Sequence, residues 1–139
     1  EFIEAKGIAM PGVEYIMEFF KQRNFRIGLA SSSPMHLIQM VVKKLKIGHY
    51  LSAITSAEKL PFGKPHPQVF LDCAELLQVN PSACICFEDS FNGMIAAKAA
   101  RMKCVIVPAP QLHQESRWDA ADLKLSSLEQ FNGQMLDKL

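Results

Sequence analysis

The sharpest chemical signal in the sequence is an acidic pair, Glu88-Asp89, directly after the apolar run 84–87. Two adjacent carboxylates at the end of a buried strand repel each other and lose solvation unless a cation neutralises them. Mg²⁺ prefers hard oxygen ligands and often uses only one or two carboxylates. The pair therefore indicates a magnesium site. The alternative is a solvated acidic turn at the start of a helix, where the helix dipole favours negative charge.

Lys64 is the second candidate, in the sequence Gly63-Lys64-Pro65-His66-Pro67. The two prolines stiffen the backbone, so the ammonium group would leave from a fixed point. A cation just before a helix is disfavoured by the helix dipole unless an anion is bound there. Lys64 is therefore predicted to face a phosphate or a charged aspartate, with an exposed loop lysine as the alternative.

The serines at 31–33 form the third candidate. They stand where a short apolar strand turns into a helix, so they offer a hydroxyl and successive backbone N–H groups. Such a turn suits a phosphate oxygen. The alternative is a plain serine cap on the helix. The three groups together are far more specific than any one of them.

Other common catalytic signatures are missing from the sequence. It contains no glycine-rich dinucleotide or P-loop motif and no nucleophile elbow. The four histidines have no metal-ligand spacing, and surface or supporting roles are favoured for them. They are His36, His49, His66 and His113.

Short apolar strands alternate with amphipathic helices along the chain. Strands are predicted at 26–30, 53–55, 84–87 and 104–107, with a weak one near 121–125. Helices are predicted at 14–22, 34–47, 68–78 and 92–100, with a last one near 127–136. Apolar strands without strict alternation indicate an α/β fold whose parallel sheet is covered on both faces. Ligands bind beyond the carboxyl ends of such strands, where all three polar groups fall.

Composition limits the classes of function. The chain of 139 residues is long enough for one domain, and its net charge of +1 disfavours a nucleic-acid binder. No apolar run approaches the ~20 residues of a membrane span. The four cysteines lie among apolar residues, and with no secretion signal this predicts buried thiols in a reducing cytoplasm.

Three segments in order resemble the haloacid dehalogenase (HAD) superfamily of hydrolases: 28–33, 63–67 and 87–93. The longer segment 56–74 is similar to the bacterial hexitol phosphatase and 2-deoxyglucose-6-phosphate phosphatase group. The resemblance covers nearly all of the chain, from about Pro11 onward. It implies a Rossmann-like parallel core sheet and Mg²⁺-dependent hydrolysis of a small sugar or sugar-alcohol phosphate.

The resemblance also implies a role for each matching position. The Ser31 hydroxyl, helped by the Ser32 amide, would hold the transferring phosphoryl group, and Lys64 would neutralise the phosphate and its nucleophile. Asp89 would bind Mg²⁺, and Glu88 would either bind it or bond to its waters. Three further residues would support these groups, with Asn92 ordering the loop after the metal: Ser33, Ser90 and Asn92.

One family motif has no counterpart in this sequence. An Asp-x-Asp pair on the central strand of the family supplies the nucleophile that forms an aspartyl-phosphate and the proton donor and acceptor. The five aspartates of this chain never stand one residue apart. We therefore expect the C-terminal part of a longer hydrolase. Residues 1–10 would be the end of a helical cap and its return linker, and 11–139 a partial core domain without the first strand and the cap.

Two expectations follow from the missing motif. The chain by itself would be inactive, and the strands ending at Ser31 and Phe87 would face a gap or pair with each other, because the first strand of the family lies between them.

Two alternatives to a phosphatase remain open. One is a phosphomutase like β-phosphoglucomutase, and the other is a non-catalytic module that keeps the phosphate-binding turn.

Overall fold

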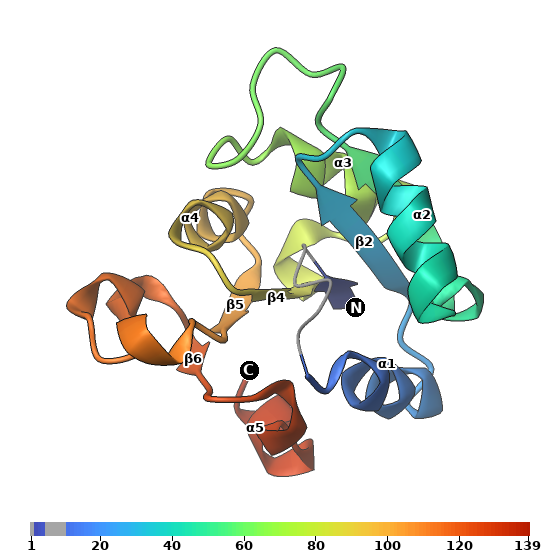
Figure 1. The fold of residues 1–139 in the computed structure, drawn as a ribbon. Helices are drawn as coiled ribbons and strands as arrows, with labels where there is room; N and C mark the ends of the chain where they lie inside the picture. The colour runs from blue at the N-terminus through green and yellow to red at the C-terminus, as the bar shows by residue number, and fades with distance from the viewer. Residues whose placement is uncertain (1, 5–10) are drawn as a thin grey trace.

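A computed structural model describes residues 2–4 and 11–139 and shows a sheet with helices on both faces (Figure 1). The strands are β1 (Phe2–Glu4), β2 (Ile27–Ser31), β3 (Leu51–Ser56), β4 (Ile85–Glu88), β5 (Lys103–Ile106) and β6 (Leu123–Lys124). Their order is β3-β2-β1-β4-β5-β6, and every pair is parallel. The predicted α/β class is confirmed.

Helices cover both faces of the sheet. They are α1 (Val13–Gln22), α2 (Met35–Leu45), α3 (Gln68–Leu77), α4 (Phe91–Ala99) and α5 (Gly133–Lys138). One core lies under α3 and α4, and the other under α1, α2 and the C-terminal segment. Figure 1 shows α3 and α4 on one side of the sheet and α1 and α5 on the other. All residues of β2 and β4 are buried, which explains their continuous apolar sequences.

Short 3₁₀ turns complete the connections: η1 (Gly48–Tyr50), η2 (Pro81–Ala83), η3 (Pro110–Leu112), η4 (Ser116–Ala120) and η5 (Leu128–Gln130). The helix predicted near 127–136 is in fact η5 followed by α5. Two local caps break it, because the side chain of Ser127 accepts a hydrogen bond from Glu129 N and that of Asn132 accepts one from Met135 N. The other predicted helices and strands are present, with ends shifted by a few residues.

The centre of the sheet differs from the sequence-based expectation. The prediction that the strands ending at Ser31 and Phe87 face a gap or pair with each other is wrong, because Phe2–Glu4 lies between them as β1. Three residues suffice because both neighbouring strands would otherwise leave buried N–H and C=O groups without partners. The end of the cap and the return linker are predicted over residues 1–10; residues 2–4 of this range form β1, and residues 1 and 5–10 lie outside the described residues, so the domain boundary at residue 10 stays a prediction.

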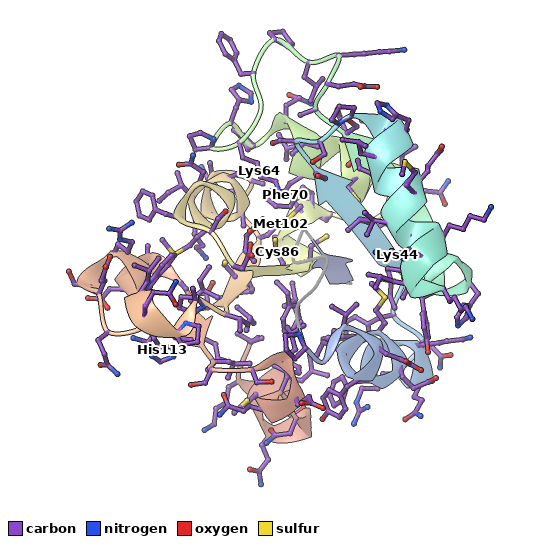
Figure 2. The ribbon with its side chains drawn as sticks, in the orientation of Figure 1. Lys44, Lys64, Phe70, Cys86, Met102 and His113 are labelled. Atoms are coloured by element: carbon purple, nitrogen blue, oxygen red, sulfur yellow. The ribbon has the colours of Figure 1, made fainter. Side chains whose placement is uncertain are left out.

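The thiols are placed as the sequence predicts. All four cysteines are buried, and Figure 2 shows Cys86 and Met102 within the core. Burial raises the pKa of Cys73 and of Cys104 to about 12, so both thiols stay protonated at neutral pH. These two cysteines therefore serve as core residues and not as nucleophiles. Within the described ranges, no helix is long and apolar enough to cross a membrane.

The carboxylate of Asp122 fixes the chain just before β6. It accepts hydrogen bonds from Lys98 Nζ and from Cys104 N, both at 2.7 Å. Burial by itself would raise the pKa of Asp122, but these two hydrogen bonds lower it below its ordinary value. Asp122 thus stabilises the fold above its unfolded pKa of about 4, and this contribution is lost as the pH falls through the lower folded pKa.

We expect Asp122→Asn to lower the Tm at pH 7 by roughly a few degrees. The difference from the wild type should shrink as the pH is lowered from about 4 towards 2, because the wild-type carboxylate is then protonated as well. Thermal unfolding followed by circular dichroism across this range measures both curves. Two curves that stay parallel down to the lowest pH would contradict this role of Asp122.

Candidate active site

Three segments meet at the carboxyl edge of the sheet. Ser31 is the last residue of β2 and Glu88 is the last residue of β4, and the two strands flank β1. The loop 57–67 leaves β3 at the same edge and arches beyond the strand ends before α3 begins (Figure 1). Parallel strands therefore bring the three predicted polar groups to one place.

The serine turn after β2 is held by its own hydrogen bonds. Ser31 is buried, and its Oγ accepts a hydrogen bond from Ser33 N at 3.1 Å. The hydroxyl of Ser56 donates to the carbonyl oxygen of Ser33. No side chain caps α2, whose N-cap residue is Pro34. The alternative of a plain serine cap is therefore wrong, and the turn presents the exposed Ser32 next to the loop that carries Lys64.

The side chain of Lys64 is buried, so the alternative of an exposed loop lysine is also wrong. Its side chain is 5% exposed. Its Nζ lies 2.9 Å from Glu88 Oε2, donates to the carbonyl oxygen of Ala30 at 3.2 Å, and stands 4.7 Å from the ring centre of Phe70. Lys64 and Phe70 lie side by side in Figure 2. The loop after β3 is thus fixed to both β2 and β4 through one ammonium group.

Glu88 is fully buried and accepts hydrogen bonds from the residues on the other side of the site. While Oε2 faces Lys64, its Oε1 accepts hydrogen bonds from Asp89 N at 2.9 Å and from both N and Oγ of Ser90 at 3.2 Å. The Ser90 hydroxyl in turn accepts a hydrogen bond from Gly93 N and so caps α4. For Glu88, the alternative of a solvated acidic turn is wrong.

A pocket of about 500 Å³ opens at this edge of the sheet. It combines predicted residues from all three segments with two that the prediction missed, Phe91 and Arg117. Its lining is Ser31, Ser32, Ser33, Lys64, Ser90, Phe91, Asn92 and Arg117. Arg117 belongs to the connection between β5 and β6, which also leaves the carboxyl edge of the sheet. The rule that ligands bind at this edge could have pointed to it.

The acidic residues here suit Mg²⁺ better than a metal that needs many protein ligands. In the part of the chain that the structure describes, no cluster of three or more histidine, cysteine, aspartate or glutamate side chains could hold a metal. Mg²⁺ commonly takes one or two carboxylates and completes its shell with waters and substrate phosphates. Neither member of the acidic pair lines the pocket, but Asp89 directly precedes Ser90, which does, and Glu88 accepts hydrogen bonds from Lys64 and Ser90 of the lining.

The sequence of the chain matches a known family of hydrolases. Residues 1–101 match the family of haloacid dehalogenase-like hydrolases, and the chain belongs to this family. Hexitol phosphatase B of Escherichia coli K12 is 46% identical over 134 residues, which cover 96% of this chain and 60% of that protein. The resemblance inferred from the three motifs is confirmed.

Phosphoglucomutases are also similar to this chain. The β-phosphoglucomutase of Bacillus subtilis is 36% identical over 96 residues, or 69% of this chain and 42% of that protein. The crystal structure of β-phosphoglucomutase from Clostridium difficile superposes with a TM-score of 0.79 at 32% identity, covering 93% of this chain and 55% of that one. The chain thus spans 60% or less of each of these three relatives.

Proposed function

We propose that this chain forms the phosphate-binding core of a Mg²⁺-dependent phosphatase of small sugar or sugar-alcohol phosphates. The observation that carries the proposal is that the serine turn, Lys64 and Ser90 line one pocket, with Glu88 of the acidic pair bonded to both Lys64 and Ser90. The similarity to hexitol phosphatase B supports the choice of substrate class.

Different residues at the pocket would have different roles in binding a phosphomonoester. The Ser31 hydroxyl and the amide groups of the serine turn bind phosphoryl oxygens, and the ammonium group of Lys64 offsets their negative charge. Glu88 keeps this ammonium group in place and aligns the backbone of Asp89. Mg²⁺ held by Asp89, with Glu88 beside it as a further ligand or a partner of its waters, would stabilise the charge that develops on the phosphoryl group.

The nucleophile in this proposal is an aspartate of an Asp-x-Asp pair, which the five aspartates of the chain do not supply. In-line attack of its carboxylate on phosphorus breaks the bond to the sugar oxygen, which takes a proton from the second aspartate of the pair, and leaves an aspartyl-phosphate. Water that gives its proton to this second aspartate then hydrolyses the intermediate to phosphate and the free nucleophile. The chain of 139 residues is expected to bind phosphate without turning over a substrate.

A chimeric protein tests this proposal. The part of hexitol phosphatase B that the chain does not match is joined ahead of residue 5 in place of Phe2–Glu4, because its Asp-x-Asp strand has to take the position of β1 between β2 and β4. Phosphate release is measured with glucitol 6-phosphate, 2-deoxyglucose 6-phosphate and a nucleoside monophosphate. We expect Mg²⁺-dependent release from the first two substrates by the chimera, and none by the chain alone. A folded chimera that binds phosphate but never releases it from a sugar phosphate would refute the proposal and favour a non-catalytic module.

The role of Asp89 is tested in the same chimera. Asp89→Asn removes a carboxylate charge while keeping the side-chain shape, and we expect kcat to fall about 100-fold, equivalent to about 2.7 kcal/mol. Asp137→Asn, in α5, makes the same change away from the pocket and serves as the control. Equal rates for the two variants would show that Asp89 holds no catalytic metal.

A phosphomutase is the second candidate, because two of the similar proteins are β-phosphoglucomutases. Both reactions would use the same phosphoryl site, so the fate of the phosphoryl group separates them. Conversion of β-glucose 1-phosphate to glucose 6-phosphate without release of phosphate would favour the mutase.

A further inference from the structure

We propose that Arg117 is a specificity-determining residue that binds hydroxyl oxygens on the carbon chain of the substrate. This inference rests on the proposed function, because it extends the same pocket from the phosphoryl group to the organic part of the ligand. It assigns substrate selection to the connection between β5 and β6, outside the three motifs that carry the family resemblance.

The pocket is wider than a phosphoryl group requires. Its volume of about 500 Å³ lies in the range of sites that hold whole small molecules. The serine turn follows β2 and Arg117 follows β5, and three strand intervals separate these strands, or about 14 Å at a spacing of about 4.8 Å. A phosphoryl group bound at the serine turn therefore leaves the part of the pocket near Arg117 for the rest of the ligand.

Arg117 is carried by a packed segment. Its neighbour Trp118 is 3% exposed, and the indole N–H donates to the carbonyl oxygen of Leu112 at 2.8 Å. The indole ring meets the ring of Phe91 edge-on with 6.4 Å between centroids, and the guanidinium carbon of Arg117 lies 5.9 Å from the indole. Phe91 is the first residue of α4, so this packing fixes η4 against the helix that follows the acidic pair.

The two cationic side chains of the pocket, Lys64 and Arg117, differ in how readily they can bind a ligand. Lys64 is paired with the buried Glu88, so its charge is held by the protein. Arg117 is paired with Glu115, and their side chains are 50% and 39% exposed. An exposed ion pair contributes little and is readily exchanged. The guanidinium group can therefore turn to a ligand at low cost.

The chemistry of this part of the pocket selects a polyhydroxylated ligand. A guanidinium group offers a planar set of N–H donors and no acceptor, so it binds ligand oxygens. Phe91 is 39% exposed and presents an apolar ring beside it. A sugar or sugar alcohol offers both hydroxyl oxygens for the donors and C–H groups for the ring.

The test compares an organic phosphate with inorganic phosphate in the chimera described above. For Arg117→Ala we expect the KM for glucitol 6-phosphate to rise about tenfold, the loss of one charged hydrogen bond. The inhibition constant of inorganic phosphate should change less than about twofold, because the proposed phosphoryl site of the serine turn, Lys64 and Mg²⁺ does not include Arg117. Lys124→Ala, which removes an exposed cation of β6, is the matched control for a change in net charge.

Three outcomes would overturn the inference. If Arg117→Ala weakens the binding of glucitol 6-phosphate and of inorganic phosphate equally, Arg117 acts as a general positive charge. Full recovery of KM by Arg117→Lys would show the same, since lysine keeps the charge but not the planar donors. An unchanged KM for glucitol 6-phosphate would show that Arg117 does not touch the ligand.

Failure of the proposed function is detected separately. If the chimera hydrolyses no sugar phosphate, the chain of 139 residues is titrated with glucitol 6-phosphate and with inorganic phosphate, and amide NMR shifts of residues 31–33 are followed. Weaker binding of only the organic ligand by Arg117→Ala supports the inference without catalysis. If the wild-type chain binds neither ligand, the inference about Arg117 is refuted.

Discussion

Lys64→Ala is expected to lower the free energy of unfolding by about 3–5 kcal/mol, the cost of breaking a buried ion pair from one side. The carboxylate of Glu88 is fully buried, and Lys64 Nζ lies 2.9 Å from its Oε2. Removal of the ammonium group leaves that oxygen without its cation and also frees the loop 57–67 from the carbonyl oxygen of Ala30. Activity lost in this variant would therefore reflect folding as well as chemistry.

Urea denaturation followed by circular dichroism measures this effect. Lys98→Ala breaks the more exposed pair with Asp122, where side-chain exposures are 33% and 24%, and should cost at most about 1 kcal/mol. If Lys64→Ala does not fold, the double variant Lys64→Met with Glu88→Gln should recover much of the loss, because no charge is then buried alone. A midpoint for Lys64→Ala equal to that of Lys98→Ala would contradict the buried-pair assignment.

Gly93→Ala is the second change with a large expected effect. A methyl group at Gly93 would overlap Cδ and Oε2 of Glu88, so the carboxylate would have to move. Movement of Glu88 breaks its contacts with Lys64 and with Ser90 together. We expect a loss of about 3 kcal/mol or more, since overpacking and an unpaired buried charge act at once.

The control is the same substitution at Gly133, where an added methyl group has enough space. The nearest atom to a methyl group at Gly133 is Arg23 Nη2, at 3.8 Å, an ordinary contact. Gly133→Ala should therefore leave the urea midpoint nearly unchanged, or raise it slightly because alanine favours a helix. If Gly93→Ala behaves in the same way, the close packing of α4 against Glu88 is not required for folding.

The polar groups of the site could be predicted because each lies at a boundary that is visible in the sequence. Ser31 and Glu88 end apolar runs, and Lys64 stands in a proline-rich loop between a strand and a helix. Since parallel strands share a carboxyl edge, this local information is enough to place the three groups together. Their hydrogen-bond partners were not predictable, because the pairing of Lys64 with Glu88 depends on the path of a whole loop.

Two features of the structure could not be predicted from the sequence patterns. The segment carrying Arg117 has no helical or strand period, and it is fixed by the long-range packing of Trp118 against Phe91. The strand Phe2–Glu4 is only three residues long, and its place is set by the open edges of β2 and β4. In both cases tertiary contacts decide the structure, and local propensity does not.

The separate origin of the two sides of the pocket has a consequence for engineering this protein. The buried ion pair joins Lys64, in the loop after β3, to Glu88 at the end of β4, whereas Arg117 lies in η4. A library that randomises position 117 and its exposed neighbours, with Trp118 retained, would sample new ligand preferences while the ion pair beneath keeps its geometry. Selection for altered substrates should start there.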